Sequence, residues 1–543
     1  MLRNYFTIAI RNLMRQKMYS LINILGLTTG LACCMLILCY VNYEHQYDQH
    51  HPNVDRIYKV LLKKRSLAGE YIVDPTTAGK LAPTLQEEYP EVELGLRTFV
   101  RPVWLSNEQI AFRQSVCFAD PHIMDLFSYP LVSGDPKGLH TSYGAFITES
   151  IARKFFGDEN PLGKRIKTDY KWDLQGEYTV VGILEDMPKT STYDLRFDMV
   201  TSTIPPGSYF ERMKWTAWTS FIKSYVLLKR GADPKALEAK LPAILEKYWP
   251  EEMARSRTYY LQPISRMHLY SRSDYGLTHA SYGDGVRVNT FLLIACFILL
   301  IACINFMNLT TAQSMRRAQE VGLRKVGGAV RHQLIGQFLT ESILLTCIAL
   351  ILALATVALV LPYISTILNR DLMMIKMTHL IPIVLIITVL TGFISGSYPA
   401  FFLSKFQPID VLKGSSVSTG KKQLRQFLVI LQFAIAIALL IGTTVAYQQT
   451  VYLLNKHLGF ESEQIVSVPI FFADRNLNAR YETVKQAFLQ HPNIQKASAT
   501  TPKSIACANS SRPFSTCSKR RNSNAKPASW TKTPGSKSFV QPA

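Results

Sequence analysis

Residues 21–41 read LINILGLTTGLACCMLILCYV and contain no charged side chain. A helix of this length crosses the ~30 Å hydrocarbon core of a lipid bilayer. The preceding residues 1–20 contain four basic side chains and no acidic one. Because Lys and Arg concentrate on the cytoplasmic side of membrane proteins, we predict a cytoplasmic N-terminus. The apolar run is longer than that of a signal peptide, so we predict an uncleaved first span at 21–41.

Four more apolar stretches predict further spans at 288–311, 338–361, 380–403 and 427–447. The connecting segments 312–336 and 404–426 each contain five basic side chains and one acidic side chain, which places them on the same side as the N-terminus. Membrane orientation therefore accounts for much of the net charge of +21, and a nucleic-acid partner is not expected. The partner that we expect for the five apolar stretches is membrane lipid.

Residues 43–287 separate the first two spans and are predicted to lie outside the cytoplasm. Strand-like runs followed by amphipathic helix patterns indicate an α/β domain. We predict a split β-α subdomain at about 54–103 and 218–270, with an insert at about 104–217. The fold class is thus a multi-pass α-helical membrane protein with a large α/β (α+β) domain between its first two spans. The predicted strands are 57–62, 145–148, 178–184 and 225–228, and the predicted helices are 77–89, 150–156 and 234–248.

The sequence offers no set of residues for catalysis. The stretch 157–164, GDENPLGK, looks like a phosphate loop, but its spacer is one residue too long, Arg165 replaces the hydroxyl residue and Pro161 removes an amide donor. His45, His50 and His51 lack the spacing of a zinc site, and the nine cysteines form no C-x-x-C pair. We therefore expect a non-catalytic chain with no cofactor and no metal.

Two adjoining stretches, ACINFMNLTTA at 302–312 and RRAQEVGLRKVGG at 316–328, closely resemble ABC transporter permeases of the MacB/FtsX family. Residues 9–13, 120–136 and 148–164 are similar to the N-terminal part and the periplasmic core domain of MacB-type proteins. The resemblance covers about residues 1–500, and the order of the pieces makes it specific.

This resemblance implies a permease subunit that works with a separate cytoplasmic ABC ATPase in the bacterial inner membrane, with the large domain in the periplasm. ATP-driven movement of the first two spans would reach that domain as a mechanical stroke, for export, lipoprotein release or cell-envelope activity. No ATP-binding motif is expected in this chain. The residues expected to couple to the ATPase are Arg316, Arg317, Glu320, Gly322, Leu323, Arg324, Lys325, Gly327 and Gly328.

Two G-x-x-x-G pairs, Gly26 with Gly30 and Gly392 with Gly396, are candidates for close helix contacts. The fifth span resembles a second start of the same pattern, so 448–502 is expected to begin a second periplasmic domain. Residues 503–543 are basic, without acid or periodicity, and are expected to be disordered, the result of a frameshift or truncation. The chain would then need a second permease half or a homodimer partner. The alternative is a membrane receptor with an extracytoplasmic ligand-binding domain, which would require a larger cytoplasmic output domain.

Overall fold

The computed structural model describes residues 10–11, 14–15, 17–65, 69–169, 176–202, 221–277, 282–312, 321–322, 324–372, 380–404, 420–456, 466, 481–498 and 541–542. The chain divides into two compact units, Met1–Leu439 and Leu440–Ala543. The first unit contains a helical bundle and an α/β domain. The division falls inside one long helix.

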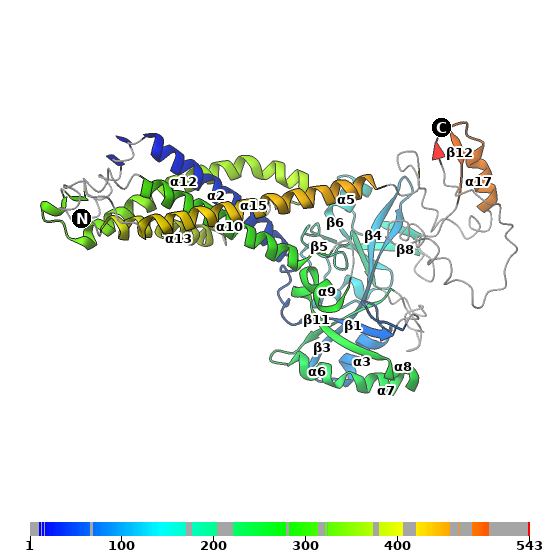
Figure 1. Cartoon of the computed structure of the whole chain (residues 1–543). Helices are drawn as coiled ribbons and strands as arrows, with labels where there is room; N and C mark the ends of the chain where they lie inside the picture. The colour runs from blue at the N-terminus through cyan, green and yellow to red at the C-terminus, as the bar shows by residue number, and fades with distance from the viewer. Residues whose placement is uncertain are drawn as a thin grey trace. The chain divides into compact units, whose positions relative to one another are not determined.

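Five helices of the described part are long and apolar enough to cross a membrane. Each predicted span lies within one of them. In the first unit α2, α10, α12 and α13 lie side by side (Figure 1). The predicted fold class, a multi-pass helical protein with an α/β domain between the first two spans, is confirmed. The helices are α2 (Lys17–His45), α10 (Gly285–Ala312), α12 (Arg331–Leu368), α13 (Leu380–Leu403) and α15 (Gly420–Asn455).

Small side chains bring the helices of the bundle close together. Ala349 and Ala353 of α12 are fully buried in a cluster that also contains Leu27 and Leu31 of α2. The Thr28 hydroxyl of α2 donates to the carbonyl oxygen of Ala349 at 3.4 Å. Since lipid tails are as apolar as these side chains, close packing and such hydrogen bonds hold the helices together.

The α/β domain is built on one mixed sheet with the strand order β11-β1-β10-β3-β4-β9-β6-β8-β5. β2 pairs with β1, and β7 pairs with β3 and β8. The long strand β3 pairs first with β10 and then with β4, so the expected boundary between 103 and 104 falls inside a continuous strand. The strands are β1 (Ile57–Arg65), β2 (Tyr71–Asp74), β3 (Val92–Ser106), β4 (Ala111–Ala119), β5 (Leu131–Gly134), β6 (Gly144–Thr148), β7 (Arg165–Asp169), β8 (Gly176–Leu184), β9 (Met199–Ser202), β10 (Lys223–Leu228) and β11 (Arg257–Pro263).

Short helices cover the sheet. The helix predicted over 234–248 is two helices, because Pro242 lacks the amide that would continue the first one. The helix predicted from Thr77 begins at Leu81, and the Thr77 amide donates to the carbonyl oxygen of Ile222. The helices of this domain are α3 (Leu81–Glu88), α4 (Ile123–Leu126), α5 (Glu149–Phe156), α6 (Pro234–Lys240), α7 (Pro242–Tyr248), α8 (Glu251–Arg255) and α9 (Met267–Tyr275).

The apolar faces of α3, α6 and α7 pack on β1 and β10. Leu81, Leu85, Leu237 and Ile244 are buried in one cluster with Val60 of β1. Burying such side chains contributes roughly 1.5–3 kcal/mol each, which fixes the helices on this face of the sheet.

The second unit contains the last part of α15, the helix α17 (Tyr481–Leu489) and the strand β12 (Ile494–Lys496), which pairs with β13 (Gln541–Pro542). Much of the expected second domain, 448–502, lies outside the described residues, as do residues 503–540 of the tail.

Candidate functional site

The segment after α10 contains the residues expected to couple to an ATPase. Arg316, Arg317, Glu320 and Leu323 lie outside the described residues. The remaining five, Gly322, Arg324, Lys325, Gly327 and Gly328, are described. Gly328 has φ +92°, a backbone conformation that L side chains rarely adopt, and it ends the turn that precedes α12.

Two of these residues bind the bundle itself. The Arg324 guanidinium donates to Oε1 of Gln337 on α12. The Lys325 ammonium donates to the carbonyl oxygen of Ser404, just after α13, at 2.8 Å. The side chain of Val321 is buried in a cluster that contains Phe338 of α12 and Ala400 of α13. The segment is therefore attached to both α12 and α13.

The exposed part of this segment is apolar and glycine-rich. Val326 is 68% exposed and is followed by the exposed Gly327 and Gly328. Sequence reasoning selected the charged neighbours and the glycines but missed Val326. In the sequence, Val326 is one apolar residue between Lys325 and two glycines. Only the structure shows that its side chain is exposed.

The four glycines of the two G-x-x-x-G pairs lie at helix contacts. A Cβ added at Gly30 would lie 2.7 Å from Cβ of Ala302 on α10, and one at Gly26 would lie 3.2 Å from Nδ2 of Asn305. On α13, a Cβ at Gly396 would lie 2.6 Å from Cβ of Ser342. One at Gly392 would lie 3.1 Å from Cα of Ile343. No real side chain fits at the shortest of these separations without displacing a helix.

A buried polar cluster connects the bundle to the α/β domain. The carboxylate of Glu44, near the end of α2, lies 2.7 Å from Nε2 of His268 on α9, and both side chains are 2% exposed. The Tyr47 ring stacks on the His268 imidazole with 3.4 Å between ring centroids. Arg370, just after α12, donates to the Tyr47 hydroxyl and places Nη2 3.9 Å from Oε1 of Glu44. We call Glu44, Tyr47, His268 and Arg370 the joint.

The joint brings together three places that are far apart in the sequence. α2 ends there, α9 of the α/β domain contacts both α2 and α10, and α12 ends beside it. Gly283, just before α10, packs against it, because a Cβ there would lie 2.6 Å from Nε2 of His268. Sequence reasoning missed the joint. Glu44 and Arg370 lie at the edges of apolar stretches, but no pattern pairs them with His268.

The loop 189–196 is fixed beside the joint. The Thr192 amide donates to Oδ1 of Asp48 at 2.9 Å, and the Asp48 amide donates to the carbonyl oxygen of Thr190 at 2.9 Å. Asp194 forms a buried ion pair with Lys59 at 2.6 Å and a second one with Lys223.

Burial affects the ionisation of these carboxyl groups in opposite ways. Burial raises the pKa of Asp48 to about 7, and the hydrogen bond from Thr192 opposes this shift only in part. Burial would also raise the pKa of Asp194, but Lys59 and Lys223 outweigh it and hold that pKa below its ordinary value.

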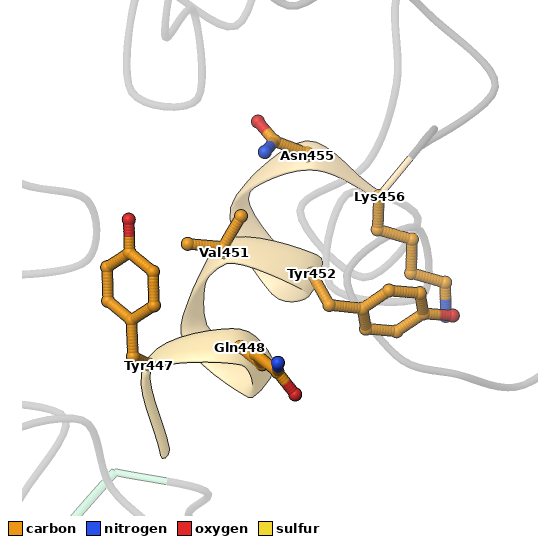
Figure 2. Close-up of a pocket in the computed structure, with 6 residues that line it drawn as sticks. All are labelled: Tyr447, Gln448, Val451, Tyr452, Asn455 and Lys456. Carbon is orange, nitrogen blue, oxygen red and sulfur yellow. The ribbon is translucent and has the colours of Figure 1, made fainter. Parts of the chain in front are cut away.

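Within the described residues no group of three or more His, Cys, Asp or Glu side chains could hold a metal ion. A hollow on the last turns of α15, shown in Figure 2, is lined by that helix alone, and its polar side chains do not converge on one point. Its residues are Tyr447, Gln448, Val451, Tyr452, Asn455 and Lys456.

These features define a multi-pass membrane protein with an α/β domain attached to its helices by a buried joint. Residues 20–244 match the MacB-like periplasmic core domain, and residues 292–408 match the FtsX-like permease C-terminal family. The chain belongs to the MacB/FtsX family of ABC transporter permeases.

Curated relatives include the macrolide export ATP-binding/permease protein MacB of Bdellovibrio bacteriovorus, which is 24% identical over 50% of this chain and 38% of its own length. The ABC transporter permease YknZ of Bacillus subtilis is 26% identical over 37% of this chain and 45% of its own length. The matches thus span less than half the length of these relatives. A solved permease domain from Porphyromonas gingivalis is 27% identical, with a TM-score of 0.33, over 39% of this chain and 91% of that domain.

Proposed function

We propose that the chain is a non-catalytic permease subunit that transmits ATP-driven movement of a separate cytoplasmic ABC ATPase to its periplasmic α/β domain. The chain would lie in the inner membrane with its N-terminus in the cytoplasm, and it would work with a second permease half or a second copy. The observation that carries this proposal is the course of α10, which runs from the α/β domain to the coupling segment as one helix of 28 residues.

A helix of this length can transmit a displacement. At about 1.5 Å per residue, α10 is roughly 42 Å long, enough to cross the membrane. At its start it contacts α9 of the α/β domain, and along its length it packs on α2, whose Gly30 permits close approach. The joint attaches the end of α2 to α9 as well. A push on the coupling segment would therefore move both helices and the domain together.

The coupling segment suits contact with a partner protein. Arg324 and Lys325 hold it on α12 and α13, which leaves Val326 exposed between Lys325 and Gly327. An exposed apolar side chain on a fixed turn can fill a pocket of a partner, and such anchors contribute much of the free energy of binding.

The experiment is to copurify the tagged chain with a candidate cytoplasmic ABC ATPase of the same bacterium and to measure the bound ATPase and its ATP hydrolysis. We expect Val326→Asp to weaken ATPase binding at least about tenfold, a loss typical of an interface anchor. The matched control is Val132→Asp, at an exposed position of β5. Equal ATPase binding by both variants would remove Val326 from the interface, and no ATPase binding by the unaltered chain would refute the function.

Orientation needs its own test. Gly157 and Gly163 lie in exposed turns of the α/β domain where an added Cβ would meet no atom within 4 Å. A reporter inserted after Gly157 should be accessible from the periplasm and protected from a cytoplasmic reagent. The opposite result would contradict the proposed orientation.

A further inference from the structure

A second pocket, of about 530 Å³, lies where the bundle meets the α/β domain. Tyr43 and Tyr47 line it from the end of α2, Ser191 and Arg196 from the loop 189–196, and Arg370 from the end of α12. All of these elements belong to the first compact unit. The proposed function does not use this pocket.

The pocket has an excess of positive charge. Lys189 and Asp371 line it as an ion pair at 3.1 Å. Arg370 faces the carboxylate of Glu44 behind it, with 3.9 Å between the nearest nitrogen and oxygen. Arg196 is exposed and forms no ion pair within the described part of the chain. One guanidinium is therefore available for an anion.

A buried hydroxyl group in the pocket also lacks a partner. Ser191 is 4% exposed, and its Oγ makes no hydrogen bond within the described residues. Leaving a buried hydroxyl unpaired is unfavourable, so almost all such groups have a partner in folded proteins. An anionic oxygen in the pocket would accept from this hydroxyl and from Arg196 together.

The loop that presents both groups is held in place before any ligand binds. Asp48 fixes its backbone at Thr190 and Thr192, and the pairs of Asp194 with Lys59 and Lys223 fix the residues beside Arg196. A rigid loop loses little conformational entropy on binding, which favours affinity.

The position of the pocket selects the kind of anion. It lies at the ends of α2 and α12, where the apolar stretches stop, and its tyrosines are typical of the membrane–water interface. Tyr363 and Ile367 on the last turns of α12 are 73% and 81% exposed, as expected of side chains that contact acyl chains. We infer that this pocket binds the phosphate group of an anionic phospholipid headgroup, held by Arg196 and the Ser191 hydroxyl, with Arg370 lining the pocket beside them.

The test uses the full chain in detergent, titrated with phosphatidylglycerol and with phosphatidylcholine while bound lipid is measured by native mass spectrometry. We expect Arg196→Gln to weaken phosphatidylglycerol binding about tenfold, because it removes a charge-assisted hydrogen bond. Ser191→Ala should weaken it less, by about threefold, because it removes one hydrogen bond to the phosphate but no positive charge. Arg370 is unsuitable for this test, because its side chain also holds the joint.

The matched control is Arg113→Gln, an exposed arginine of β4 away from the pocket, which should bind phosphatidylglycerol like the unaltered chain. Equal affinity of the Arg196→Gln and Arg113→Gln variants would overturn the inference. So would equal affinity of the unaltered chain for both lipids. Displacement of phosphatidylglycerol by inorganic phosphate at the same concentration would overturn the lipid assignment and indicate a site for free phosphate. The proposed ATPase coupling is independent of all these outcomes.

Discussion

The Nε2 atom of His268 lies 2.7 Å from Oε2 of Glu44, although 224 residues separate the two in the sequence. This contact joins the end of the first span to the α/β domain, and Arg370 brings the end of α12 to the same place. Because both side chains are almost fully buried, neither can exchange its partner for water. The joint therefore couples the position of α2 to that of α9.

Glu44→Ala should destabilise the chain by about 3 kcal/mol, because it leaves the buried imidazole of His268 without its acceptor. Glu44→Gln should cost less, since its amide oxygen can still accept from His268. The measurement is the midpoint of denaturant unfolding of the full chain in detergent. Glu251→Ala, which removes an exposed pair with Arg255, is the control and should change stability by less than about 0.5 kcal/mol. Equal losses at Glu44 and Glu251 would show that the joint contributes nothing.

Gly30→Ala should push α2 away from α10 and lower the free energy of unfolding by about 1–3 kcal/mol, the usual range for overpacking. Its Cβ would lie 2.7 Å from Cβ of Ala302, whereas a Cβ at Gly442 on α15 meets no atom within 4 Å. Gly442→Ala is therefore the matched control and should leave the thermal midpoint unchanged or raise it. The second substitution Ala302→Gly should restore the stability that Gly30→Ala removes. Failure of this rescue would count against a direct contact.

Asp48→Asn should stabilise the chain increasingly as the pH rises. The folded-state pKa of Asp48 is about 7, above the value of ~3.9 for an unfolded chain, so the folded state binds the extra proton. The stability that this proton provides is complete below pH ~4 and is lost between pH ~4 and 7, at about 1.4 kcal/mol per pH unit at most. Asn keeps the acceptor for Thr192 and cannot ionise.

Thermal unfolding of both proteins between pH 4 and pH 8 measures this difference. Asp55→Asn, at an exposed position, is the control and should show no such trend. A constant difference between the Asp48→Asn variant and the unaltered chain across this range would exclude titration of Asp48 as its cause.

Asp194→Ala should be more damaging than Lys59→Met. Removing Asp194 leaves two buried ammonium groups, of Lys59 and Lys223, without a counter-charge, and breaking a buried pair in this way costs about 3–5 kcal/mol. Lys59→Met leaves Asp194 paired with Lys223, so the loss should be smaller. Unfolding midpoints of the two variants give the order. The reverse order would mean that Asp194 does not hold the cluster together.

Much of the architecture could be predicted because each membrane span requires a long apolar stretch that is visible in the sequence. A stretch without charge, such as 21–41, must be a helix in a bilayer. In no other conformation can a single segment pair its own backbone N–H and C=O groups there. The strands of the α/β domain could be located from short apolar runs, as with 145–148, which lies in β6. Helix ends were harder to predict where a proline lies inside an amphipathic pattern. The amphipathic pattern over 234–248 predicts one helix, whereas Pro242 ends α6 and begins α7.

The contacts and the exposure of the coupling segment could be predicted from the sequence much less well than the membrane spans. The sequence predicts Arg324 and Lys325 as coupling residues, and only the fold shows that they also bind Gln337 and Ser404 and that Val326 beside them is exposed. A residue's type limits what it can contact, whereas burial and orientation determine what it does contact.

The amino-acid sequence by itself determined that this chain crosses a membrane, how its spans are spaced and which family it resembles, because hydropathy and motif spacing act along the chain. Only the tertiary structure decided that Glu44, His268 and Arg370 meet, that Asp48 is buried with a raised pKa, and that Ser191 and Arg196 face one pocket. The contacts among Glu44, His268 and Arg370 join residues more than a hundred positions apart, and all of these arrangements depend on burial that arises only when the helices and the sheet pack together.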